Sequence, residues 1–523
     1  METSRLFTSS VESCAHEDLQ AGRICILSST SFPRVASFRT PRDLAGHLSA
    51  LGWPLPIDEE ILQGTASPLA QPLKIPWLGG KRTVGNRFAV HPMEGWDAQP
   101  DGLPSELTRR RWLNFGNSGA KLIWGGEAVA VVPEGRANPN QLLLNGRTAS
   151  ALATLRADTV NLHQERFGRT DDLVFGLQLT HSGRFCRPNA FDRLEPLIAY
   201  RHPLLDAKHK GNIEPISDAE IERIIAAFGE AARLVLEMGF DFVDLKHCHG
   251  YLGHELLSAH ERPGRYGGSF ENRTRFLREL VEAVRSSAKG LEIGVRISAY
   301  DSVPFVPDEK TWRGKPAPAQ TPYRWGFGVN PENPVEPDLA ETKRFLGLLE
   351  SLGVKLVNVT AGSPYYCAHI QRPALFPPVD AYLPPVDPLI GAARLQWAAR
   401  ELKSTSNAVI VSTGWTYFQE YLPHIAQALV REGWTDFVGL GRMMLSYPDL
   451  PADVLQQGRL ERKRICRTFS DCTTGPRLGL PSGCFPLDPF YKARPEAEQL
   501  KVLVEQIKEE RAVAVAGKGS DEP

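Results

Sequence analysis

The stretch GFDFVDLKHCHGYLGHELLSAHERPGRYGGSFENRTRF, from Gly239 to Phe276, decides how the rest of the chain is interpreted. After the breaker Gly239, the apolar residues of 240–245 predict a short buried strand that follows a helical segment. Polar and titratable residues then crowd together as KHCHGY, 246–251. At the carboxyl end of a parallel barrel strand, such residues face the ligand-binding end. The alternative is a polar loop with one or two hydrogen-bonded histidines.

Strand and helix segments alternate along most of the chain, and eight such units can be counted. The fold class predicted from this count is α/β, a (β/α)8 TIM barrel. A helix is expected at 217–238, where Ser217 and Glu220 form a capping signature. Another is expected at 105–117, with Arg109, Arg110 and Arg111 as a solvated face. The predicted strands are 88–90, 121–124, 173–179, 240–245, 291–297, 355–360, 408–412 and 436–439.

Composition narrows the class of protein. The chain has 523 residues, of which 42% are hydrophobic, and a formal net charge of −1. A near-zero charge argues against a nucleic-acid or membrane-surface partner. No apolar run approaches the roughly 20 residues of a transmembrane helix, and the N-terminus lacks the pattern of a secretory signal. Eight cysteines in so long a chain do not make a disulfide framework, so a cytoplasmic location is expected.

The second half of the opening stretch resembles a known family. Residues 266–276, YGGSFENRTRF, match the Tyr-Gly-Gly-Ser-x-Glu-Asn-Arg-x-Arg-Phe pattern of the old yellow enzymes, a family of FMN-dependent ene-reductases and NADH:flavin oxidoreductases. The motif Gln178-Leu179-x-His181-x-Gly183-Arg184 is also similar to that family. The resemblance covers about 68–490 and implies an FMN-binding TIM barrel there.

The remaining segments are assigned around that barrel. An N-terminal extension of unknown role is expected at 1–67, and a charged helix with a loose tail at 491–523. Two proline-rich loops, 302–337 and 361–388, follow strand ends and are expected at the active site. A surface excursion is the alternative for 302–337.

The resemblance implies bound FMN, with NADH or NADPH as reductant. It assigns cofactor contacts to nine residues: Pro92, Met93, Glu94, Gly126, Gln178, Arg296, Gly414, Gly441 and Arg442. The amide of Gln178 can both donate to and accept from the edge of a flavin ring. Glu94 takes a position that is often Thr or Cys in the family. A carboxylate there would disfavour an anionic reduced flavin and lower its potential, unless Glu94 turns away into a salt bridge.

The resemblance also implies the reaction. In the family, FMN accepts hydride from a nicotinamide and passes it to the β-carbon of an activated alkene. Aligned on Gly250, this chain has Tyr251 as the proton donor and His249 as the second carbonyl-binding residue. Lys246 stands at the first carbonyl-binding position, which is usually His. Because lysine is a point-charge donor, we expect a small substrate that bears an anion. Tyr365 or Tyr366 is expected to line its pocket.

Other readings stay open. The same flavin site would serve an amine-oxidising, demethylating enzyme, or a sensor that holds flavin without turnover. A Schiff-base lyase that uses Lys246 as its nucleophile is a third alternative. Cys466, Cys472 and Cys484 are expected to be free thiols rather than zinc ligands. The substrate, the nicotinamide preference and a homo-oligomeric state are left open.

Overall fold

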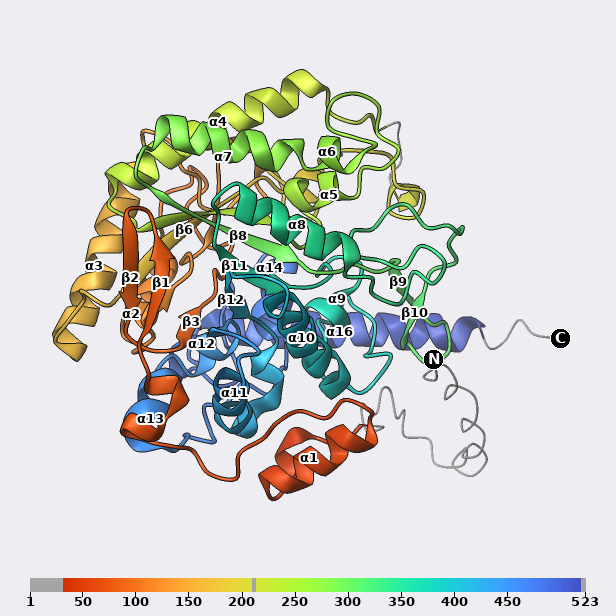
Figure 1. Cartoon of the computed structure of the whole chain (residues 1–523). Coiled ribbons are helices and arrows are strands. Elements are labelled where there is room, and N and C mark those ends of the chain that lie inside the picture. Colours follow the sequence, from red (N-terminus) through yellow and green to blue (C-terminus); the bar gives the residue numbers. More distant parts are fainter. Residues whose placement is uncertain (1–31, 209–212, 519–523) are drawn as a thin grey trace, which may run out of the picture.

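A computed structural model describes residues 32–208 and 213–518 of the chain. Its centre is a closed parallel barrel with helices outside, as predicted (Figure 1). In chain order its strands are β3 (Phe88–Val90), β4 (Leu122–Ile123), β5 (Ala128–Ala130), β6 (Val174–Thr180), β7 (Phe242–His247), β8 (Glu292–Ser298), β11 (Leu356–Thr360), β12 (Val409–Ser412) and β13 (Phe437–Leu440). Eight of the nine barrel strands in the described residues start and end within two residues of the predicted ones, and the ninth, β5, was not predicted.

Nine strand segments make eight barrel positions, because β4 and β5 share one. Both pair with β6, β4 through Leu122 and Val174, and β5 through Ala128 and Gln178. The barrel closes where β3 pairs with the last strand, β13. The carboxyl ends of all eight positions therefore meet around one rim, which in this architecture holds the ligand.

The helices outside the barrel cover its apolar strands. The Ser217–Glu220 capping box is present, which confirms the predicted start of α4. α4 packs against α7, and Figure 1 shows the two side by side. The outer helices are α2 (Glu106–Gly116), α3 (Ala149–Phe167), α4 (Asp218–Glu237), α7 (Arg275–Ser287), α8 (Ala340–Ser351), α10 (Pro388–Lys403), α11 (Leu422–Arg431) and α13 (Leu450–Gln457).

An antiparallel hairpin that we did not predict closes the amino end of the barrel. It consists of β1 (Leu73–Trp77) and β2 (Gly80–Val84). Its apolar face packs on residues inside the barrel, among them Phe242. The backbone N–H of Leu78 at its tip donates to Glu292 Oε2 at 2.8 Å. With this end filled, the carboxyl rim is the end left for a ligand.

The segments outside the barrel have structure of their own. α1 (Pro41–Ala50) lies in the predicted N-terminal extension, and a short hairpin, β9 (Phe305–Pro307) with β10 (Gly314–Pro316), lies in the first proline-rich insertion. α16 (Pro495–Lys518) reaches this insertion, where the Arg511 guanidinium stands 4.5 Å from the Trp312 ring centroid (Figure 1). Predictions for 1–31 and 519–523 lie outside the described residues, and the division of the chain into three parts stays a prediction.

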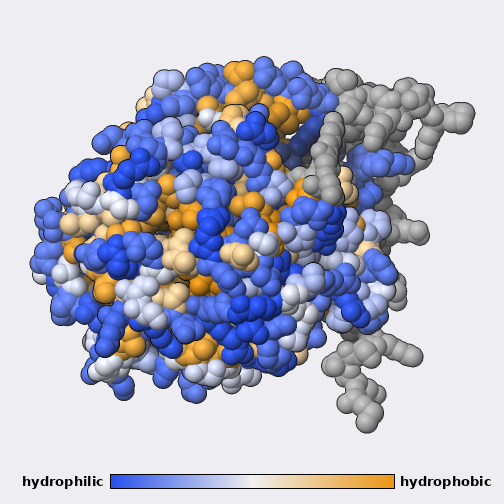
Figure 2. Space-filling model, turned by 90° about the horizontal axis from the view of Figure 1, so that it is seen from above, coloured by the Kyte–Doolittle hydropathy of each residue, from blue (hydrophilic) through white to orange (hydrophobic). Residues whose placement is uncertain are grey.

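The surface is mixed in character. The face in Figure 2 is largely hydrophilic, with apolar residues in scattered patches. Large exposed apolar side chains, such as Leu78 and Phe191, are single residues from different segments. Within the described ranges, none of the helices combines the length and apolar character that a membrane crossing requires.

The prediction that Arg111 belongs to a solvated face is wrong. Its side chain is buried and donates to both oxygens of Asp97, at 2.8 and 2.6 Å, and to Glu127 Oε2 at 3.2 Å. The other oxygen of Glu127 accepts from the backbone N–H of Gly95 at 2.8 Å. This buried ion cluster fixes the loop that follows β3, the first barrel strand.

We expect Arg111→Met to lower the free energy of unfolding by about 3–5 kcal/mol, because two carboxylates are left buried without a cation. The loss should grow as pH rises. Burial already raises the pKa of Glu127 and Arg111 opposes that rise, so without Arg111 the folded state prefers the protonated acid. Urea unfolding at several pH values measures both effects.

Arg109→Met, on the same helix, is the matched control. Arg109 is half exposed and pairs with Asp158 at 3.0 Å, so its loss should change stability by less than about 1 kcal/mol. Equal effects of the two substitutions would contradict the assignment of the buried cluster.

Candidate active site

A cavity of about 1200 Å³, its open mouth included, lies at the carboxyl rim of the barrel. It brings together the predicted site residues except Gly126. The carbonyl of Gly126 instead accepts from the N–H of Met93 at 3.0 Å and so holds the loop after β3. The predicted residues that line the cavity are Pro92, Met93, Glu94, Gln178, Lys246, His249, Tyr251, Arg296, Gly414, Gly441 and Arg442.

One side of the cavity is a buried polar group from β6, β7 and β8. Gln178 Nε2 donates to Asp244 Oδ2 at 2.5 Å. Burial raises the pKa of Asp244 to about 6, and its hydrogen bonds and the nearby Arg296 oppose that rise. Arg296 is itself buried, and its Nε has no partner among the described residues. A buried cation with an unused donor suits an anionic or strongly polar ligand edge.

An ion pair lies beside this polar group, since Lys246 on β7 pairs with Arg296 on β8. Lys246 Nζ contacts Glu94 Oε1, and the side chains are only 3% and 16% exposed. The hydroxyl of Tyr251 donates to the other oxygen, Glu94 Oε2, at 2.8 Å. The ammonium also stands 3.8 Å from the centre of the Tyr251 ring. Burial first, and then the negative charge of Glu94, hold the pKa of Tyr251 well above its usual value. Tyr251 is therefore a protonated donor.

This pairing removes the basis of three expectations. The positive charge of Lys246 is balanced before any substrate arrives, so it gives no reason to expect a substrate anion. The negative charge of Glu94 is equally balanced, so its effect on a flavin potential is reduced; the salt bridge was the stated alternative. A Schiff-base nucleophile must have its amine free to attack a carbonyl, whereas Lys246 Nζ is held by Glu94.

Aromatic residues from the second proline-rich loop complete the wall beside Tyr251. Tyr365 lines the cavity, its hydroxyl lies 3.0 Å from that of Tyr251, and its ring stacks on Phe185 at 3.9 Å. Tyr366 turns away and donates to Asp301 at 2.7 Å. Of the two tyrosines that we considered, Tyr365 is the one at the cavity.

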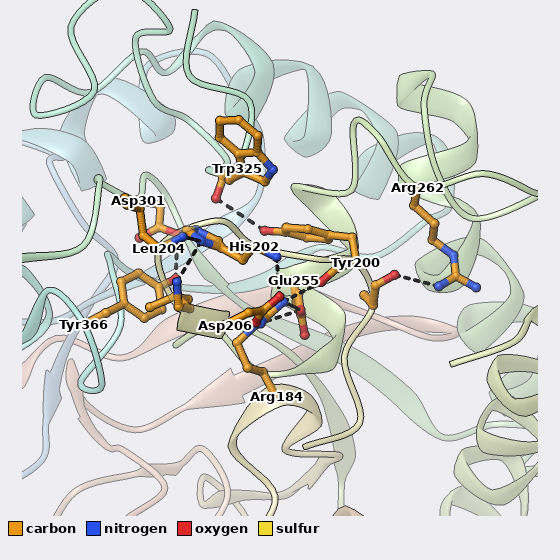
Figure 3. Close-up of polar contacts among 12 residues, drawn as sticks. Arg184, Tyr200, His202, Leu204, Asp206, Glu255, Arg262, Asp301, Trp325 and Tyr366 are labelled. Carbon is orange, nitrogen blue, oxygen red and sulfur yellow. Dashed lines mark hydrogen bonds and ion pairs between the residues drawn. The ribbon is translucent and has the colours of Figure 1, made fainter. Parts of the chain in front are cut away.

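The first proline-rich insertion supports this wall. None of its residues, 302–337, lines the cavity; the 361–388 loop does so instead. Figure 3 shows how the insertion is anchored: the Tyr200 hydroxyl donates to the carbonyl of Trp325 at 3.3 Å. Tyr200 is in turn held by Arg184, whose Nη2 donates to its carbonyl oxygen at 2.6 Å and to Glu255 Oε1 at 2.6 Å. Arg184 of the Gln178 motif therefore has a structural role.

His249 faces the cavity with an unusual backbone. Its φ of 67° lies in the left-handed region that few non-glycine residues adopt. Hydrogen bonds to its backbone fix it there: its N–H donates to Ser298 Oγ at 3.0 Å, and its carbonyl accepts from Ser363 Oγ at 2.8 Å. Burial, reinforced by Arg296 and Lys246, holds the pKa of His249 well below its usual value, so the imidazole is neutral. A neutral imidazole carries one N–H donor.

The part of the cavity around Arg442 is cationic and was missed by the sequence analysis. Arg372 from the second proline-rich loop, and Cys472, Thr473 and Arg477 from α14 (Asp471–Arg477), join Arg442 there. Several buried nitrogens in this part of the cavity, Arg372 Nε and Nη2 and Arg442 Nη1, have no partner in the described part of the chain. Isolated arginines in proline-rich loops give no sequence signal for such a cluster.

The three predicted free thiols lie near this part of the cavity. Cys466 and Cys484 are buried, Cys472 is half-buried, and all three are free. Among the described residues, no group of three His, Cys, Asp or Glu side chains is arranged to hold a metal ion.

We expect Glu94→Gln to lower the free energy of unfolding by about 3 kcal/mol, because it leaves the Lys246 ammonium buried without a counter-charge. The double variant Glu94→Gln/Lys246→Met should recover most of that loss. Glu94→Gln should also lower the pKa of Tyr251, since the carboxylate charge contributes to its rise. Urea unfolding and ultraviolet titration, with Tyr251→Phe to assign the tyrosinate signal, measure these effects. No recovery in the double variant would refute the pairing.

Comparisons with known proteins agree with this barrel. The model of the NADH:flavin oxidoreductase / NADH oxidase family matches residues 68–309. An NADPH dehydrogenase of Bacillus velezensis is 31% identical over 244 residues, which cover 45% of this chain and 65% of the relative. An NADH oxidase of Thermoanaerobacter brockii is 25% identical over 402 residues, with 76% and 53% covered. The chain thus spans about half to two thirds of the length of these relatives.

A solved structure supports the fold. The old yellow enzyme homologue from Zymomonas mobilis superposes with a TM-score of 0.50 at 18% identity, and the match covers 76% of this chain and 94% of that one. Residues 68–309 are therefore similar to the NADH:flavin oxidoreductase / NADH oxidase family, and the barrel has the fold of an old yellow enzyme.

Proposed function

We propose that the protein is an FMN-dependent oxidoreductase that passes hydride from NADH or NADPH to a small activated alkene. The observation that carries this proposal is the meeting of two donors, neutral His249 and protonated Tyr251, with Gln178 and Arg296 in one cavity. A cytoplasmic location and the absence of nucleic-acid partners, expected from composition, belong to the same proposal.

FMN, the cofactor that the family implies, suits the donors of the cavity. Gln178 and Arg296 would serve the polar edge of the ring, because Arg296 has an unused buried donor and Gln178 carries an amide. Gly414 and Gly441-Arg442, after β12 and β13, lie where barrels of this kind bind phosphate. A Cβ at Gly414 would come within 2.7 Å of Leu395 at a φ of 92°, so only glycine suits this turn.

The residues of the chain supply binding and proton transfer. When bound, FMN supplies the hydride chemistry. The N–H of His249 would donate to a substrate carbonyl and stabilise the charge that develops on its oxygen. Tyr251 would then give its phenolic proton to the α-carbon. The nearest source for its replacement is the Lys246 ammonium, relayed through Glu94, which contacts both groups.

The ion pair bears on the choice of substrate. Because Lys246 and Glu94 neutralise each other, the substrate end of the cavity favours a neutral, carbonyl-activated alkene. Amine oxidation is the alternative reaction that the same cofactor site would serve. An assay with enones as acceptors and tertiary amines as donors separates the two.

The first test is the visible spectrum of the purified protein, followed by anaerobic addition of NADH or NADPH. We expect a flavin spectrum that either nicotinamide bleaches, and release of FMN on denaturation. A colourless protein that does not take up added FMN would contradict the proposal.

Tyr251→Phe should slow re-oxidation by an enone by about 100-fold or more, because the proton donor is lost. Bleaching by the nicotinamide should be unchanged, since that step needs no proton from Tyr251. Stopped-flow measurement of each half-reaction separates these effects. Equal slowing of both would show that Tyr251 shapes the site without donating the proton.

A further inference from the structure

The cations of the cavity divide into those that have a carboxylate partner and those that do not. Lys246 is paired with Glu94. Arg477 Nη1 is paired with Asp380 Oδ1 at 2.7 Å. Arg372 and Arg442, in contrast, form no ion pair within the described residues. Unpaired cations at a buried position carry a cost that a bound anion would remove.

The two unpaired arginines are neighbours. Arg442 Nη2 donates to the carbonyl of Pro373, the residue after Arg372, at 3.0 Å. Burial first, and then repulsion from Arg477 and Arg442, lower the pKa of Arg372 to about 9. The nearby thiol of Cys472 does not balance them, because burial raises its pKa. The geometry therefore sets two guanidinium groups side by side with no acid between them.

Arg372 is held with its free edge available. Its Nη1 donates to Thr473 Oγ1 at 2.5 Å, while Nε and Nη2 are buried without a partner. Thr473 belongs to α14, so the C-terminal segment positions a residue of the loop after β11. The two free nitrogens form one edge of the guanidinium, the geometry that binds a phosphate with two hydrogen bonds.

We propose that Arg372 is a second phosphate-binding arginine that acts together with Arg442 on the phosphate group of the flavin. This rests on the proposed FMN site. A phosphate monoester carries a charge of about −1.5 to −2 at neutral pH, which two guanidinium groups balance. The alternative source of a phosphate is the 2′-phosphate of NADPH, and the experiment distinguishes the two.

The test compares the binding of FMN and riboflavin, which differ by the phosphate, to flavin-free protein by quenching of flavin fluorescence. Arg372→Met should weaken FMN binding roughly 10- to 100-fold, because a hydrogen bond to a charged group is lost. Riboflavin binding should change by less than about 3-fold, and Arg372→Lys should restore part of the FMN affinity. Arg477→Met is the matched control: it removes an equal charge from the same wall, but one that Asp380 balances, and should leave the FMN-to-riboflavin ratio unchanged.

Three outcomes would overturn the assignment. If Arg372→Met weakens the binding of FMN and of riboflavin equally, the role of Arg372 is purely structural. If it weakens neither, Arg372 does not contact the phosphate. Unchanged FMN binding with a lost preference for NADPH over NADH would assign Arg372 to the nicotinamide phosphate.

A separate measurement keeps this inference distinct from the proposed function. Inorganic phosphate should raise the melting temperature of the wild-type protein and have a smaller effect on Arg372→Met, whether or not flavin binds. If phosphate stabilises the protein but neither FMN nor riboflavin binds, the FMN proposal is wrong and the anion site is still supported. Equal effects of phosphate on the two proteins would sink the anion site itself.

Discussion

Closure of the barrel between its first and last strands is the constraint on which the site depends. β3 and β13 are far apart along the chain, yet Phe88 pairs with Val438 and Val90 with Leu440, each pair 350 residues apart. This pairing sets the loop that carries Met93 and Glu94 beside Gly441-Arg442. A Cβ at Gly441 would meet the Met93 sulfur at 3.2 Å, which shows how closely the two loops pass. Parallel pairing all the way round then sends every strand end to the same rim.

The charged side chains at the rim are of two kinds: those in an ion pair and those without a carboxylate partner among the described residues. Buried ion pairs bring little net stability but are costly to break, so a balanced pair such as Glu94 with Lys246 is a fixed part of the wall. Cations without a carboxylate partner, in contrast, indicate where a ligand binds. Arg372 and Arg442 form no ion pair within the described residues, and Arg296 has an Nε without a hydrogen-bond partner there, so each would be satisfied by an anionic or polar part of a ligand. The proposed FMN, with its polar ring edge and its phosphate, carries both kinds of group.

The sequence predicts those parts of the fold that depend on a local pattern of residues. A buried strand is an apolar run of a few residues, so all eight barrel positions could be placed within two residues, and the capping box of α4 could be read directly. The β1–β2 hairpin was missed although the pair Gly79-Gly80, at the turn and the start of β2, is a recognised turn signal. Partners distant in the chain could not be predicted. Arg109 and Arg111 look alike in sequence, but two positions along a helix turn a side chain to a different face.

Glu94 and Lys246 show most clearly what the sequence could not predict. Each residue was interpreted alone, but the charges of the two side chains balance each other. Taken singly, a lysine predicts an anionic substrate and a glutamate predicts a flavin that is harder to reduce. Placed in contact, they form an ion pair with no net charge. Either residue without the other would bury an uncompensated charge. The two charges are therefore coupled by electrostatics, and both touch Tyr251: Glu94 accepts from its hydroxyl, and Lys246 lies over its ring.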